Sequence, residues 1–254
     1  MVTPPTVCVI TGATGHKNLR KCIESVQEQS YAMIEHLVVT DGPERREAVD
    51  AVLNSFDDRR GIKTILLPHI TGKNRWNAHR IYGGMPSIAM TDYVVFLDED
   101  NWFDQDHVES LVASVQSSKA VWSFALRKLV DTDGNFVDVD QCESLGNLHP
   151  TFRSSNEFHI DANCYMLRRD VAIQLAAIWN RVGYGIELPD PDRLLCRVLM
   201  EHYPNGQSTR KFTVNYTVGN TAASGSMDYF THGNSIMRLK YPHGYPWEDA
   251  PATS

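Results

Sequence analysis

The sequence predicts an α/β protein in which a mostly parallel sheet is flanked by helices. Short apolar segments rich in β-branched residues alternate with segments in which apolar residues recur at helical spacing. Acidic turns follow directly after two of the predicted strands, at residue 41 and at residues 98–100. This alternation is typical of parallel strands that are joined by crossover helices.

The first half of the chain contains four predicted strands. They fall at residues 7–11, 36–40, 62–67 and 93–97, and amphipathic helices are expected at residues 19–26, 49–56 and 108–115. After residue 120, two apolar segments around Asp133-Gly134 predict a small hairpin, at residues 122–129 and 136–139. Further helices are expected at residues 171–181 and 193–202, and the Pro- and Gly-rich tail from residue 241 predicts irregular chain.

The chain has no internal repeat and no low-complexity linker, which favours one domain with an extension. We expect the domain at residues 1–216, with a nucleotide-binding half at about 1–118 and an acceptor-side half at about 119–216. Residues 217–254 are expected to pack on this domain or to be partly disordered.

Composition excludes several classes of protein. The net charge of −7 opposes a nucleic-acid partner, since binding to phosphate backbones needs a basic surface. The five cysteines are odd in number and contain no CxxC, so neither a disulfide framework nor a zinc site is predicted. No segment is apolar enough to span a bilayer, and no secretory signal is apparent. We therefore expect a cytoplasmic protein.

The most informative motif is the acidic turn after the fourth predicted strand. VVFL runs directly into Asp98, Glu99 and Asp100. Ligands of open α/β sheets bind beyond the carboxyl ends of the strands. Clustered carboxylates there are costly unless a cation compensates them, and magnesium or manganese prefers such oxygen ligands. The alternative is a purely structural role, in which the acidic loop caps the next helix through Asp104 or Asp106.

These motifs resemble those of the family 2 glycosyltransferases of GT-A fold. The similarity covers roughly residues 6–216 and includes a helix signature formed by Ser25, Val26, Gln29, Ser30 and Tyr31. The second strand ends in Thr40-Asp41-Gly42, where the family has two acids before the glycine. Thr11-Gly12 stands where the family usually has Pro-Thr, so the identity of the nucleotide stays open.

The resemblance implies a nucleoside-diphosphate sugar as donor and Mn²⁺ or Mg²⁺ as cofactor. The expected nucleotide-sugar contacts are Thr11, Gly12, Asp41, Lys73, Arg80, Asp98 and Glu99. The expected metal ligands are Asp100 and Asp98, with His232 if the chain folds back to them. Lys73 and Arg80 could equally form an exposed basic loop, and a lone histidine is more often structural.

Transfer with inversion also needs a general base on a separate loop. The resemblance assigns this role to the segment before residues 193–202, and we favour Asp192 over Asp190. Asp190 also fits the N-cap of a helix whose first residue is Pro191. Candidate acceptor contacts are Asp161, Asn163 and Glu187, although buried polar residues in a turn would look similar.

Function is therefore expected to be sugar transfer to a glycan or lipid-linked hydroxyl, with peripheral membrane association possible. A sugar-nucleotide nucleotidyltransferase and a non-catalytic carbohydrate-binding protein of the same fold are the alternatives. A dinucleotide-dependent dehydrogenase is suggested by VITGATG at residues 9–15, but the third glycine of such a turn is replaced by Asn18. The sequence leaves the oligomeric state open.

Overall fold

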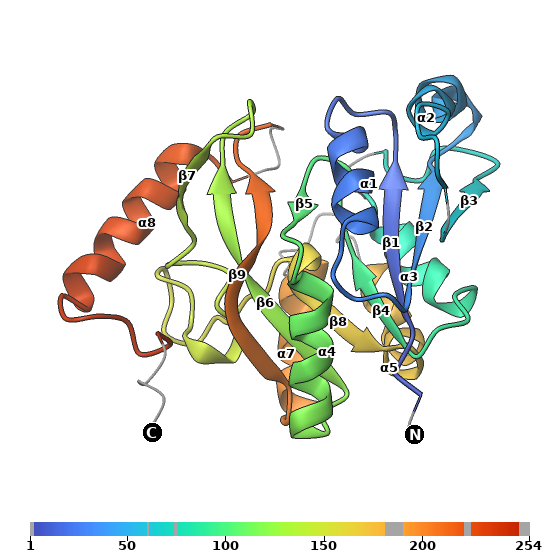
Figure 1. Ribbon diagram of the computed structural model, residues 1–254. Helices are drawn as coiled ribbons and strands as arrows, with labels where there is room; N and C mark the ends of the chain where they lie inside the picture. The colour runs from blue at the N-terminus through green and yellow to red at the C-terminus, as the bar shows by residue number, and fades with distance from the viewer. Residues whose placement is uncertain (1–2, 60, 74–75, 181–189, 221–224, 249–254) are drawn as a thin grey trace.

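The computed structural model describes residues 3–59, 61–73, 76–180, 190–220 and 225–248, which form an α/β fold around one mixed sheet (Figure 1). Within these residues the sheet has nine strands in the order β3-β2-β1-β4-β8-β6-β9-β5, and β7 pairs with β6 outside this path. The predicted fold class is confirmed.

The strands and helices follow the alternation expected for the first half of the chain. The strands are β1 Val7–Ala13, β2 Ile34–Thr40, β3 Ile62–Leu66, β4 Tyr93–Phe96, β5 Trp102–Phe103, β6 Trp122–Val130, β7 Phe136–Val139, β8 Tyr165–Arg168 and β9 Gln207–Thr217. The α-helices are α1 Leu19–Gln27, α2 Arg46–Leu53, α3 His79–Gly84, α4 His107–Ser118, α5 Arg169–Gln174, α6 Ala176–Trp179, α7 Pro191–His202 and α8 Met227–Lys240. Short 3₁₀ turns are η1 Pro43–Arg45, η2 Met85–Ser87, η3 Gly146–Leu148 and η4 Ala162–Cys164.

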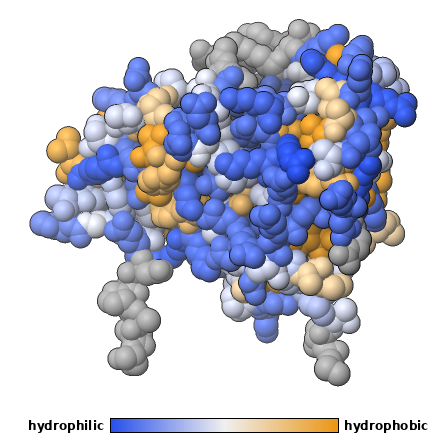
Figure 2. Space-filling model, turned by 45° about the horizontal axis from the view of Figure 1, so that its top comes forward, coloured by the Kyte–Doolittle hydropathy of each residue, from blue (hydrophilic) through white to orange (hydrophobic). Residues whose placement is uncertain are grey.

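The parallel part of the sheet decides where the acidic turns lie. β1 pairs in parallel with both β2 and β4, and β2 pairs in parallel with β3. The carboxyl ends of β2 and β4 therefore meet at one edge, at the top of Figure 1, and bring Asp41 and Asp98 to it. Figure 2 turns this edge toward the viewer and shows a largely hydrophilic surface, with apolar residues in limited areas.

The second half of the sheet contains most of the antiparallel pairing. β8 runs antiparallel to β4 and β6, while β9 is parallel to β6 and antiparallel to β5. The hairpin predicted around Asp133-Gly134 is confirmed as β6 and β7. β9 was not expected, because only its second half is buried and its polar first half resembles a loop.

One predicted helix is divided in the structure, and two helices, α3 and α8, were not predicted. Instead of one helix at residues 171–181, the chain forms α5 and α6, which are separated by Leu175 at φ −94° and ψ 3°. α3 was not expected, because Gly83 and Gly84 weaken its helical pattern. A Cβ at Gly83 would lie 2.9 Å from the carbonyl oxygen of Ala176, so glycine allows α3 and α6 to pack closely.

The C-terminal segment lies beside the β6–β7 hairpin, and α8 occupies the side of the molecule away from β1 and β2 (Figure 1). Asn234 donates to the Asp138 carboxylate at 3.0 Å and to the Val139 carbonyl at 2.8 Å. Trp247 is 1% exposed and donates to Gln141, so the tail through residue 248 packs on the domain. Among the described helices, none is long and apolar enough to cross a membrane.

Candidate functional site

A cavity of about 530 Å³ lies at the carboxyl edge of the parallel strands. It is lined by Gly12, Thr14, His16, Asp41, Arg45, Ile70, Gly72, Lys73, Asn77, Ala78, His79, Ile81, Tyr82, Asp98, Glu99, Asp100, Asn101, Asp161, Ala162, Asp192, Tyr216 and Thr217. Eight predicted site residues meet there: Gly12, Asp41, Lys73, Asp98, Glu99, Asp100, Asp161 and Asp192. Segments far apart in the sequence thus supply one site.

Glu99 organises the loop between β1 and α1. Its Oε2 accepts the main-chain N–H groups of Thr14, Gly15 and His16 at 2.9, 3.0 and 2.9 Å. Its Oε1 accepts the Thr14 hydroxyl at 2.5 Å. Gly15 has φ +88°, a value that favours glycine and lets the successive N–H groups converge on one oxygen. Glu99 therefore holds one wall of the cavity in shape.

Asp41 holds the opposite loop in a similar way. Its Oδ1 accepts both the main-chain N–H and the hydroxyl of Thr71, at 2.6 and 2.8 Å. Its Oδ2 accepts the Gly72 N–H at 2.9 Å. This bonding orders the loop that carries Lys73, whose side chain is exposed at the rim of the cavity.

Asp98 is the first acid of the turn and has partners on both oxygens. Oδ1 accepts the Tyr82 hydroxyl at 2.5 Å, and Oδ2 accepts the Asn163 side-chain N–H at 2.9 Å. The Asp98 main-chain N–H in turn donates to Asn163 Oδ1 at 2.6 Å. Burial raises the pKa of Asp98, although the Tyr82 hydrogen bond opposes this shift.

Asp100 differs from its neighbours because one of its oxygens is unsatisfied. Oδ2 accepts a hydrogen bond from Asn220, whereas Oδ1 is buried and has no hydrogen-bond partner among the described residues. Its main-chain oxygen accepts from Asn18 and Thr217, which fixes the backbone. Burial, with the charge of Asp98, raises the pKa of Asp100 to about 7. A buried acceptor without a donor is costly, so a ligand at Oδ1 would relieve this cost.

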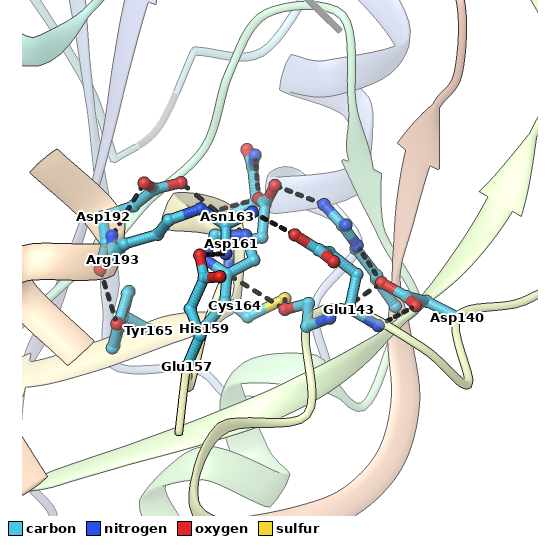
Figure 3. Close-up of polar contacts among 12 residues, drawn as sticks. Asp140, Glu143, Glu157, His159, Asp161, Asn163, Cys164, Tyr165, Asp192 and Arg193 are labelled. Carbon is cyan, nitrogen blue, oxygen red and sulfur yellow. Dashed lines mark hydrogen bonds and ion pairs between the residues drawn. The ribbon is translucent and has the colours of Figure 1, made fainter. Parts of the chain in front are cut away.

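A buried arginine links the cavity to the second half of the sheet. Arg127 of β6 donates to Asp140 at 2.8 Å and to Asp161 at 2.5 Å, and its side chain is 3% exposed. Asp161 Oδ1 also accepts the main-chain and side-chain N–H groups of Asn163. In the view of Figure 3, Asp161 and Asn163 lie between Asp192 on one side and Asp140 on the other. Arg127 therefore anchors the carboxylate that lines the cavity.

Replacing Arg127 with methionine is expected to lower the free energy of unfolding by about 3–5 kcal/mol, because Asp140 and Asp161 would lose the charge that compensates them. Urea unfolding followed by circular dichroism measures this loss. Arg20→Met is the matched control, since Arg20 pairs with Glu24 on the exposed face of α1. That control should change stability by less than about 1 kcal/mol. A similarly small effect of Arg127→Met would contradict the expected role.

Asp192 lies in the first turn of α7 and lines the cavity. Its Oδ1 accepts the Arg193 main-chain N–H at 2.8 Å, and its side chain is 23% exposed. Burial raises the pKa of Asp192 to about 7, with further contributions from Asp161 and Asp190. Asp190 is exposed at the N-cap position before Pro191; it does not line the cavity, and its side chain makes no capping hydrogen bond among the described residues.

Four other predicted site residues do not line the cavity. Thr11 is buried in β1 and bonds to His36 at 2.9 Å, and Arg80 places its guanidinium 3.9 Å from the centre of the Trp76 ring. Asn163 lies behind Asp98 and Asp161. His232 is exposed on α8, with its ring 6.1 Å from that of Phe152. The structure does not bring His232 to the acidic turn, and Glu187 lies outside the described residues.

Several residues at the cavity were not predicted from the sequence. These are His16, Arg45, Asn77, His79, Tyr82 and Tyr216. His16 and Arg45 follow the carboxyl ends of β1 and β2, so the rule that placed Asp41 and Asp98 would also have found them. His79 and Tyr82 lie on α3, which was not expected.

The match to a known family agrees with this arrangement. Residues 6–175 match the family described as Glycosyl transferase family 2. The chain belongs to that family. The match includes the acidic turns after β2 and β4 and ends at Leu175, between α5 and α6, so Asp190 and Asp192 lie beyond it.

Two relatives extend the comparison. "Glycosyltransferase GlyA" of Streptococcus pneumoniae is 29% identical over 171 residues, which are 65% of this chain and 22% of that relative. An uncharacterized protein of Haemophilus influenzae is 36% identical over 81 residues, 32% of this chain and 50% of that protein. The chain thus spans about a fifth of GlyA and half of the second relative.

Solved structures of S. aureus TarS share the fold. TarS 1–349 in complex with UDP-GlcNAc superimposes with a TM-score of 0.57 at 16% identity, covering 94% of this chain and 67% of that one. TarS 1–349 without a named ligand gives a TM-score of 0.56 at 15% identity over 94% of this chain and 66% of TarS. The GT-A fold expected from the sequence is confirmed.

Proposed function

We propose that the protein transfers a sugar from a nucleoside-diphosphate sugar to an acceptor hydroxyl, with inversion at the anomeric carbon. The observation that carries this proposal is that one cavity joins the acidic turn after β4 to Asp192 at the start of α7. The two sides of the cavity suit the two halves of such a reaction. The side at the acidic turn would stabilise the leaving diphosphate, and the side at Asp192 would accept the proton of the acceptor hydroxyl.

The donor side combines hydrogen-bonded loops with local positive charge. Arg45 and Lys73 line the cavity although the whole chain carries a net charge of −7. These two cations can attract a diphosphate that the overall charge would repel. UDP-GlcNAc and UDP are bound to TarS in its solved complexes, which supports a nucleotide sugar as the class of donor.

Asp100 fits the divalent cation that the family implies. Its Oδ1 is a buried carboxylate oxygen for which the described part of the chain supplies no donor, and Asp98 lies two residues away in the same cavity. The described residues contain no group of three or more His, Cys, Asp or Glu side chains that could hold a metal by themselves. Magnesium needs no such group, since one or two carboxylates and substrate phosphates are its usual ligands. We propose that Asp100 and Asp98 hold Mn²⁺ or Mg²⁺, which would offset charge on the departing diphosphate.

Asp192 is proposed as the general base. Its carboxylate takes the proton of the acceptor hydroxyl while the acceptor oxygen bonds to the anomeric carbon. The bond from that carbon to the diphosphate oxygen breaks on the opposite face, which inverts the configuration. A pKa of about 7 suits this role, because a base is most effective when its pKa lies near the working pH. Asp161 lines the acceptor side and is proposed to contact a glycan or lipid-linked acceptor.

Incubation with nucleotide sugars tests the proposal, with UDP-GlcNAc as the first probe and manganese or magnesium present. We expect release of the nucleoside diphosphate and its loss when the cation is chelated. A saturating donor, at about 100 times its dissociation constant, should also stabilise the fold by about 2.7 kcal/mol and raise the melting temperature. Release of pyrophosphate would instead identify a nucleotidyltransferase. Carbohydrate binding without turnover of any donor would identify a binding protein.

A further inference from the structure

A buried histidine, to which the proposed sugar transfer assigns no role, lies beside Asp192. His159 is 5% exposed, and its Nε2 lies 3.8 Å from Asp192 Oδ2. Its Nδ1 is also buried and has no hydrogen-bond partner among the described residues. Figure 3 shows His159 with Asp161, Asn163 and Asp192 in one cluster. The main-chain oxygen of His159 accepts the Gly146 N–H at 2.8 Å, which fixes its backbone.

The surroundings of His159 determine its charge and its tautomer. Burial holds the pKa of His159 well below its usual range, and three arginines lower it further. The imidazole is therefore neutral and carries one N–H. A proton on Nδ1 would be a buried donor without an acceptor, and the lone pair of Nε2 would face the Asp192 carboxylate. A proton on Nε2 instead directs the N–H at Oδ2 and leaves only an unpaired acceptor at Nδ1, which proteins tolerate better.

We propose that His159 is a positioning residue for Asp192, and that its Nε2–H holds Oδ2 while the Arg193 main-chain N–H holds Oδ1. The inference rests on the proposed role of Asp192 as base. The separation of 3.8 Å exceeds hydrogen-bond length, and the proposal requires it to shorten when an acceptor fills the cavity. Such tightening is common in catalytic groups, whose hydrogen bonds are often long before the substrate binds.

Charges from several elements act on this pair. Asp161 and Asp190 raise the pKa of Asp192, while Arg193 lowers it. The groups that oppose a charge on His159 are Arg193 of α7, Arg127 of β6 and Arg153 of the loop after η3. Arg193 is itself paired with Glu143 and Glu157, so it does not donate its guanidinium to Asp192 in the described contacts. His159 is the neutral donor that faces Oδ2.

Two substitutions separate this role from packing. His159→Leu keeps an apolar side chain of similar size but removes the N–H. His159→Gln can place an amide N–H near the position of Nε2. We expect His159→Leu to lower kcat about 10- to 100-fold with the KM for the donor unchanged, because it removes a hydrogen bond to a charged group. The acid limb of the pH profile of this variant should move to higher pH, because the ionised Asp192 carboxylate loses the N–H donor that stabilises it. His159→Gln should recover most of both.

The control is His202→Leu, which changes an exposed histidine at the far end of α7 and should leave kcat unchanged. Thermal melting of each variant checks that it folds. If Leu and Gln at position 159 lower kcat equally without moving the acid limb, the side chain acts through packing and the proposal is overturned. Unchanged kcat in His159→Leu would overturn it as well.

A measurement on the free protein is independent of turnover. Nitrogen-15 NMR of the histidine rings should show His159 with its proton on Nε2, and the resonance is identified by its absence in His159→Gln. Its Nε2–H signal should shift in Asp192→Asn. A proton on Nδ1, or no response to Asp192→Asn, would overturn the contact. Failure of the proposed function would appear differently, as a wild-type protein that turns over no donor but retains these NMR signals.

Discussion

Asp192→Asn is expected to lower kcat about 10²- to 10⁴-fold, the usual contribution of a general base. Asparagine has nearly the shape of aspartate and can still accept the Arg193 main-chain N–H, but its amide cannot take a proton. Donor affinity should stay within about twofold, because the base acts on the acceptor. Steady-state rates of transfer and the donor dissociation constant measure the two effects.

The pH profile of the wild-type protein gives a second test of Asp192. Its carboxylate must be ionised to act as base, and its pKa is raised to about 7. The rate should therefore fall as the pH drops through about 7, and this limb should be absent in Asp192→Asn. Asp190→Asn is the matched control, since Asp190 is exposed and does not line the cavity. A fall in rate in Asp190→Asn, with none in Asp192→Asn, would reassign the base to Asp190.

Asp100→Asn is expected to reduce both transfer and donor hydrolysis by at least about 1,000-fold. The buried Oδ1 accepts no hydrogen bond from any residue that the structure describes, and an amide in its place would bind a cation more weakly. Unlike the change at Asp192, this one should also raise the dissociation constant of the donor measured with manganese. Isothermal titration calorimetry with manganese and UDP measures the loss of binding in this variant, and the rate of donor turnover is measured separately.

Asp106→Asn provides the control for Asp100. Asp106 lies in the same acidic segment, but its side chain is 45% exposed and pairs with Lys211 at 2.8 Å. Its replacement should leave donor turnover within about twofold. If Asp100→Asn turned over donor as fast as this control, the proposed cation site would be wrong.

Sequence reasoning located the site through local rules. The ends of β2 and β4 could be placed because apolar strands run directly into Asp41 and Asp98, and parallel strands bring such ends to one edge. The start of α7 was recognisable from Asp190-Pro191, since proline suits the first turn of a helix. The identity of the base within that turn came from resemblance and stays a prediction.

The support of the site could not be derived in this way. Arg127 lies in a strand whose other residues are mainly apolar, and nothing in its neighbours shows that it faces Asp140 and Asp161. Asn163 is 65 residues from Asp98, yet it bonds to both the main chain and the side chain of that residue. Such partners are set by the pairing of β8 with β4 on one side and with β6 on the other, which no local pattern encodes.

The contact between Glu99 and residues 14–16 occupies a turn of the kind that binds phosphate in other proteins. Three converging main-chain amides after a strand normally form a receptor for an external anion. Here the chain fills that receptor with its own side chain, so a pyrophosphate would have to displace Glu99 to enter it. The VITGATG turn at residues 9–15 is therefore occupied by a side chain of the same protein, and the diphosphate of the proposed donor would be neutralised elsewhere in the cavity.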